Sequence, residues 1–238
     1  MMYSNNVSLL NNITAQVKWK MVTYSNILTT FVFVQIIFSF LSSHSGMSGS
    51  GINNMELREY FYSLDSVMMV SAFTAVGIGI TLAASQLVKE NFSIPTTRLS
   101  ANISTILFLC IANFFATVTA ILTNNITLFI KMMFFDYDVV IGTIFPSMTT
   151  FFTLYMILLF ASAVGYFIGS FIKVSKVLTV ILAIIVFTLF IRVIPLERNF
   201  FLWLLDHSYS VFMFKAFITS FLLYSIACIV TNRQEVRR

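Results

Sequence analysis

The chain has 238 residues, of which 58% are hydrophobic and only 10% are charged, with a formal net charge of +5. A soluble domain carries about 25% charged residues, so this composition excludes an ordinary soluble protein. The basic residues are scattered over short loops and the termini, which disfavours nucleic acid as a partner. We therefore expect an all-α integral membrane protein with a single transmembrane domain, since helices satisfy their own backbone groups in lipid.

Residues 1–21 are expected to form an interfacial helix on the cytosolic surface of the membrane. Leu9, Leu10, Ile13, Val17 and Met21 recur at three- and four-residue spacing and make one apolar face. The alternative is an unstructured basic tail.

Six apolar runs follow, each long enough to cross a bilayer as a helix. They lie at about 22–42, 66–88, 103–123, 146–172, 177–195 and 210–231. The first outer loop begins with a flexible Ser/Gly-rich run, and we expect a more helical acidic stretch with Glu56 and Glu59 after it. Between the last two spans, the segment 196–209 is too apolar for a free loop and too short to cross. It is predicted to be a short re-entrant outer helix, with Trp203 at the interface.

The charges predict the orientation of these spans. With the N-terminus inside, nine basic residues face the cytosol and five face outward, and seven of the nine carboxylates lie outside. This split obeys the positive-inside rule and places both termini in the cytoplasm. The inner set is Lys18, Lys20, Lys89, Arg98, Lys173, Lys176, Arg233, Arg237 and Arg238, and the outer set is Arg58, Lys131, Arg192, Arg198 and Lys215.

Small residues recur every four positions in two of the spans. The ridges are Ser71, Ala75, Gly79 and Ala83 in the second span, and Ala161, Gly165 and Gly169 in the fourth. Such ridges let helices approach closely in lipid. Packing within the subunit is the favoured use, and a seam between two subunits is the alternative.

The sequence contains no phosphate-binding loop, no nucleophile elbow and no metal-ligand signature, so we expect no enzyme activity, metal or cofactor of its own. The middle of the spans has no carboxylate or histidine, which disfavours ion-coupled transport. The deepest charge, Lys215, lies near the outer end of the sixth span and can reach toward Asp206. Any transport energy therefore has to come from another polypeptide.

A short charged turn follows the second span, where Pro95 keeps Ile94 out of helical geometry and Thr96 or Thr97 can cap the next helix. This turn is either a docking element for a cytosolic partner or a plain connector. The surface helix, the six spans, the segment Ile94-Pro95-Thr96-Thr97-Arg98-Leu99-Ser100 and the re-entrant segment together resemble type-2 ABC exporter permeases. The resemblance covers the whole chain and is nearest to short peptide and antimicrobial-peptide exporters of Gram-positive bacteria.

That resemblance implies a permease in a bacterial cell membrane, which pairs with a second permease as a homo- or heterodimer. It also implies two cytosolic ATPase subunits that carry ATP and Mg²⁺, and an amphipathic or hydrophobic cargo. The implied ATPase-coupling residues are Gln16, Lys18, Lys20, Lys89, Glu90 and Arg98. The implied outer-gate residues are Glu197, Trp203, Asp206 and Lys215. The alternative hypothesis is a membrane protein that transports nothing and serves in immunity, assembly or sensing.

Overall fold

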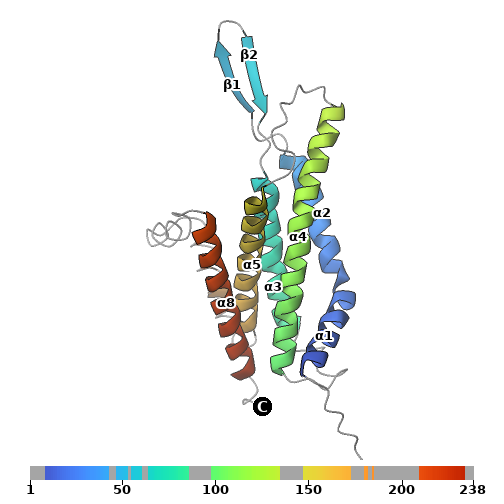
Figure 1. Cartoon of the computed structure of the whole chain (residues 1–238), viewed down its shortest axis with the longest axis vertical. Helices are drawn as coiled ribbons and strands as arrows, with labels where there is room; N and C mark the ends of the chain where they lie inside the picture. The colour runs from blue at the N-terminus through green and yellow to red at the C-terminus, as the bar shows by residue number, and fades with distance from the viewer. Residues whose placement is uncertain are drawn as a thin grey trace, which may run out of the picture.

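The computed structural model is a bundle of long helices with a small β-hairpin at one end (Figure 1). It describes residues 9–42, 47–52, 55–60, 64–85, 98–134, 147–172, 180–181, 184 and 209–233. Within these residues, four helices are long and apolar enough to cross a membrane, or five spans if one bent pair is counted as a span. The expected helical, multi-pass membrane class is therefore confirmed.

The first two helices, α1 (Leu9–Thr23) and α2 (Ser25–Ser42), are the bent pair. Their axes differ by 51° at Tyr24, where the backbone remains hydrogen-bonded from Tyr24 N to Lys20 O and from Ile27 N to Tyr24 O. The helix that the sequence placed before the first span is thus present, and it ends at Thr23, two residues later than expected. It continues almost directly into that span.

The segment after α2 differs from its prediction. Where a flexible run and a helical stretch were expected, the chain forms an antiparallel hairpin of β1 (Met47–Ile52) and β2 (Met55–Tyr60), with Met47 opposite Tyr60 and Ile52 opposite Met55. Polar and apolar residues alternate from Met55 to Arg58, which is a strand period and not a helical one. The hairpin projects from the end of the bundle opposite the C-terminus (Figure 1).

The remaining helices are α3 (Asp65–Ser85), α4 (Arg98–Phe134), α5 (Met148–Phe171) and α8 (Tyr209–Arg233). Three lie close to predicted spans. α4 is much longer than its expected 103–123: its 37 residues correspond to about 55 Å of helix, against about 30 Å of hydrocarbon. It therefore extends beyond its neighbours (Figure 1). The predicted span 177–195 lies outside the described residues, except for helical positions 180, 181 and 184.

The helices run in two directions. α4 is parallel to α1 and α2, because Gln16 meets Ser100 and Ser39 meets Thr127. The helices α3, α5 and α8 are parallel to one another and run in the opposite direction. Between α3 and α5, Val76 and Ala83 lie beside Gly165 and Gly169, in the same order along both helices. Between α5 and α8, Met156 and Ser162 lie beside Phe212 and Tyr224, again in the same order. Consequently α1, the first described helix, begins at the same end of the bundle at which α8, the last one, ends (Figure 1).

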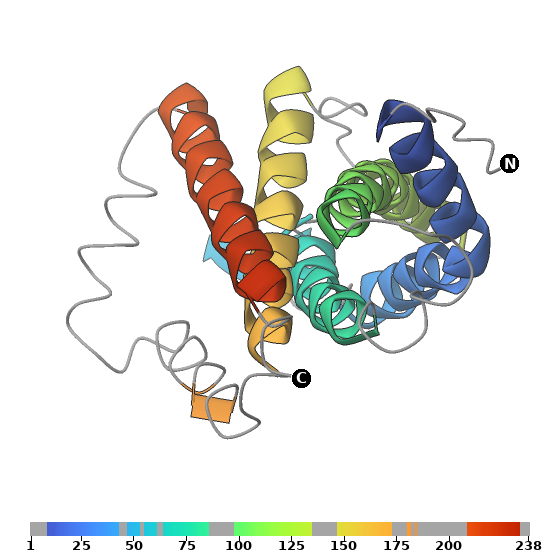
Figure 2. The same ribbon diagram turned by 90° about the horizontal axis from the view of Figure 1, so that it is seen from below.

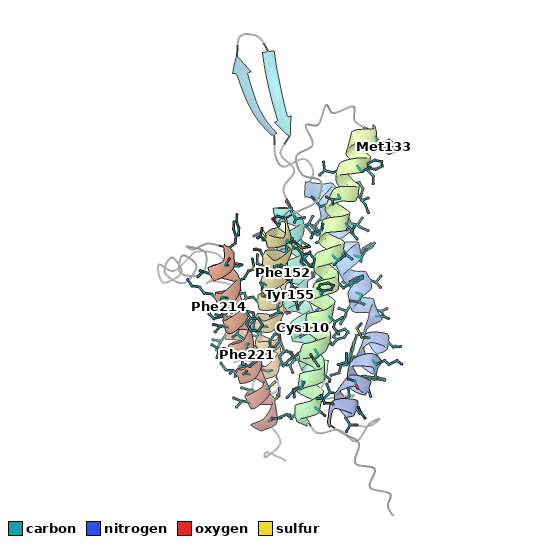
Figure 3. All side chains as sticks on the ribbon, in the orientation of Figure 1. Cys110, Met133, Phe152, Tyr155, Phe214 and Phe221 are labelled. Atoms are coloured by element: carbon teal, nitrogen blue, oxygen red, sulfur yellow. The ribbon has the colours of Figure 1, made fainter. Side chains whose placement is uncertain are left out.

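Viewed along the bundle, α8, α5 and α3 form a row, and α4, α2 and α1 group at the far side of α3 (Figure 2). Buried side chains from α2, α3, α4, α5 and α8 make one core, which includes Phe31, Phe108, Leu158 and Tyr166. Large rings such as Phe152, Phe214 and Phe221 point outward from the bundle (Figure 3). An apolar exterior of this kind is suited to lipid.

Candidate functional site

The α3–α5 contact is made by the two small-residue ridges, which face each other within one chain. A Cβ on Gly79 would lie 2.5 Å from Ser162 O and 2.7 Å from Tyr166 N, and one on Gly169 would lie 2.7 Å from the Cβ of Ala83. Each close neighbour of Gly79 is backbone, so the two helices approach as closely as their main chains permit. These glycines therefore pack α3 against α5 within the chain.

The other ridge residues have different neighbours. Ala75 and Ala161 are buried in the core. Ser71 is turned toward α2, where its hydroxyl accepts a hydrogen bond from Gln35. The seam proper is therefore built from Gly79 and Ala83 on α3 with Gly165 and Gly169 on α5.

Gln35 forms the first polar junction inside the bundle, between α2, α3 and α4. Its side chain is fully buried, and its amide nitrogen donates to Ser71 Oγ (3.0 Å) and to the carbonyl oxygen of Ala116 (2.9 Å). The Oε1 atom of the same amide has no hydrogen-bond partner. Both amide protons are used, so the junction joins three helices and leaves one buried acceptor unsatisfied.

A second polar junction joins α4, α5 and α8. Asn113 Nδ2 donates to Ser162 Oγ at 2.6 Å, and that hydroxyl lies 2.8 Å from the Tyr224 hydroxyl. Ser162 Oγ also donates to the carbonyl of Leu159, so the tyrosine is the donor in its own contact with Ser162. These bonds connect α8 to the rest of the bundle.

A second set of hydrogen bonds lies nearer the base of the bundle, which is the end where α1 and α4 begin and α5 and α8 end. Tyr166 Oη donates to Asn102 Oδ1 (3.1 Å), and Asn102 Nδ2 donates to Thr231 Oγ1 (2.7 Å). The same three helices, α5, α4 and α8, are thus joined at two levels. Polar contacts of this kind hold helices together where water supplies no hydrophobic drive.

The base of the bundle holds two of the predicted coupling residues, and both are turned inward. Gln16 is 5% exposed, and its amide nitrogen donates to Ser100 Oγ at 3.3 Å. Lys20 is 2% exposed, and its ammonium donates to the carbonyl of Ala101 and to the hydroxyls of Ser104 and Thr105. In this arrangement neither side chain reaches the surface. The apolar face expected to lie in lipid turns toward the bundle only in part: Ile13 is buried and Met21 packs against the core, whereas Leu10 is 73% exposed.

The other predicted site residues are distributed as follows. Lys18 is exposed on α1, Arg98 is the first residue of α4, and Lys215 is partly buried on α8. Five residues lie outside the described part of the chain: Lys89, Glu90, Glu197, Trp203 and Asp206. The predicted charged turn and the predicted outer gate therefore remain sequence predictions.

Sequence reasoning missed the hydrogen-bond junctions. It noted no partner for Gln35 or Asn113, although an amide inside an apolar span is itself a signal of helix contact. In the portion of the chain that the structure describes, no group of three or more His, Cys, Asp or Glu side chains is placed to hold a metal ion.

Comparisons with protein-family models, with curated proteins and with solved structures find no match to this chain. The functional argument consequently depends on the residues and their arrangement.

Proposed function

We propose that this protein is the transmembrane permease subunit of an ATP-driven exporter in a bacterial cell membrane. The observation that carries the proposal is the meeting of α1 with the first turns of α4. The resemblance implies that the surface helix and the turn after the second span receive force from a cytosolic ATPase, and Arg98, the last coupling residue of that turn, is the first residue of α4. The contact of α1 with α4 at one end of the bundle gives such a partner a single structural unit to act on.

Six crossings with both ends in the cytoplasm are part of the proposal. α5 and α8 run in the same direction and pack side by side. The chain between Ile172 and Tyr209 therefore has to return to the opposite end of the bundle before α8 begins. This return supports a crossing at the apolar run 177–195, and it agrees with the charge pattern of the loops.

The energy source in the proposal is a separate pair of ATPase subunits, and the path is completed by a second permease. An apolar exterior and an interior whose polar groups are mostly paired suit a membrane scaffold that another protein drives. The proposed cargo is amphipathic or hydrophobic, such as a peptide or a lipid.

Co-purification tests the proposal directly. The full chain is extracted from its own membrane in mild detergent, and the soluble protein bound to it is identified and assayed for ATP hydrolysis. We expect an ATP-binding subunit that is lost from the Arg98→Glu variant. The matched control is Lys131→Glu, which makes the same charge change at the other end of α4 and should retain the partner.

Two results would contradict the proposal. One is a stable, active protein with no ATPase bound, and the other is equal retention of the ATPase by both variants. A bound histidine kinase or protease in place of an ATPase would favour the alternative, a sensory or assembly partner that transports nothing.

A further inference from the structure

Lys20 stands out among the buried residues because it places an amino group inside the protein, where an apolar side chain of similar size would pack without desolvation. It is among the largest fully buried side chains of the described residues. Its Nζ atom lies 3.1 Å from the carbonyl oxygen of Ala101, 2.8 Å from Ser104 Oγ and 2.6 Å from Thr105 Oγ1. Burying an ammonium group is costly, so its presence is weak evidence for stability and better explained by specificity.

The position of this amino group on α4 strengthens that argument. It contacts the first two turns of a helix that has no acidic residue in its first turn. Free backbone N–H groups make this end of a helix positive, so a cation is least favoured there. Lys20 is therefore poorly placed for simple electrostatic stabilisation of α4.

Gln16 and Lys20 instead form a ladder between α1 and α4, in which each rung is one side-chain hydrogen bond. The Gln16–Ser100 and Lys20–Ser104 hydrogen bonds join residues that are both 84 positions apart. Four residues are about one helical turn, so the rungs repeat along two parallel helices in one register. Sliding α1 forward by one turn would bring Lys20 to Phe108, a fully buried ring that packs against Tyr24. The hydrogen bonds of the ladder thus favour the observed register over a forward slip of one turn.

We infer that Lys20 is a positioning residue, which fixes the register of α1 on the first turns of α4 so that the two helices move as one unit. Its part in energy coupling rests on the proposed function, whereas the register itself does not. In an exporter, a displacement of α1 by the ATPase would then be transmitted to α4 without a change in the register of the two helices.

Cysteine cross-linking of the full chain in lipid nanodiscs reads the register, with Cys110 and Cys228 replaced by alanine. The pair Val17→Cys with Ala101→Cys reports the native register, because these positions are also 84 residues apart. The pair Ile13→Cys with Ala101→Cys reports the forward slip of one turn, because these positions are 88 residues apart, as Lys20 and Phe108 are. We expect the parent protein to cross-link in the native pair only.

In Lys20→Met, the native cross-link should fall by about tenfold and the slipped cross-link should appear, as expected when a buried hydrogen-bonding group is lost. The matched control, Lys18→Met, removes an exposed lysine from the same helix and should keep the native pattern. The paired change Ser104→Ala with Thr105→Val removes two acceptors on α4 and should also lower the native cross-link, which keeps the test decisive if Lys20→Met does not fold. A native pattern in both altered proteins would overturn the inference.

Coupling is measured separately, on the complex with its ATPase. There Lys20→Met should keep ATP hydrolysis while cargo moved per ATP falls by about tenfold. Unchanged transport per ATP in a slipped variant would overturn the coupling role. Absence of an ATPase partner would defeat the proposed function alone, since the cross-linking result does not depend on it.

Discussion

The α3–α5 seam makes a quantitative prediction at Gly165. A Cβ at this position would lie 2.8 Å from both the carbonyl carbon and the Cα of Val76, and closer still to its carbonyl oxygen. Ordinary van der Waals contact begins near 3.4 Å, so Gly165→Ala has to separate the two helices by more than about 0.6 Å, because the carbonyl oxygen is closer than the two carbons. All three obstructing atoms are backbone, and no side chain can rotate to relieve the clash.

Overpacking of this kind typically costs about 1–3 kcal/mol of unfolding free energy. Alanine also gains up to about 1 kcal/mol over glycine from helix propensity, which partly offsets the loss. Gly77→Ala separates the two effects, because Gly77 lies on α3, the helix that Gly165 of α5 contacts, with nothing within 4 Å of the added Cβ. The control gains the propensity term alone, so the difference between the two variants isolates the overpacking term.

The assay is reversible unfolding of the full chain in detergent, followed by intrinsic fluorescence. We expect Gly77→Ala to be at least as stable as the parent and Gly165→Ala to be less stable than Gly77→Ala by about 1–3 kcal/mol. Equal stability of the two variants would refute the close approach of α3 and α5.

Three further predictions follow from the polar junctions and the helix directions. Gln35→Met should change the free energy of unfolding by less than about 1 kcal/mol, because it removes an unsatisfied oxygen together with two hydrogen bonds. Gln35→Glu should cost about 3 kcal/mol, because it places a carboxylate inside the bundle. Unfolding of both variants measures this difference, and equal losses of stability would contradict it. Tyr224→Phe should lose about 1 kcal/mol in the same assay through its Ser162 contact, and exposed Tyr209→Phe should lose nothing; a neutral Tyr224→Phe would argue against the junction. In a background without native cysteines, Ser147→Cys and Ser210→Cys should react with an impermeant maleimide from one side of the membrane and Arg233→Cys from the other; labelling of all three from one side would exclude parallel α5 and α8 spans.

The class of the protein and much of its helix plan were predictable from the sequence. The apolar runs at 66–88, 146–172 and 210–231 correspond to α3, α5 and α8, because lipid demands about twenty apolar residues per crossing. The residues of the seam were also identifiable, since Gly and Ala repeated at one-turn spacing mark close helix contact. The charge of the loops predicts an orientation that awaits the labelling experiment.

The local sequence pattern was insufficient where one segment is compatible with both a strand and a helix. The segment around Glu56 and Glu59 alternates as a strand yet carries residues that are common in helices, and the pairing with β1 decides between them. The length of α4 was underestimated for a related reason. Polar residues such as Asn124 and Asn125 interrupt the apolar run, but the helix continues through them.

Only the tertiary structure decides what the polar and small residues contact. The resemblance implies that Gln16 and Lys20 contact an ATPase, whereas the fold buries both against a helix more than 80 residues away in the sequence. Gly79 and Gly165 were predicted to permit a close approach, but the sequence does not name their partner. Periodicity determines which face of a helix is special, whereas the partner of that face depends on how distant segments pack, which is a property of the whole bundle.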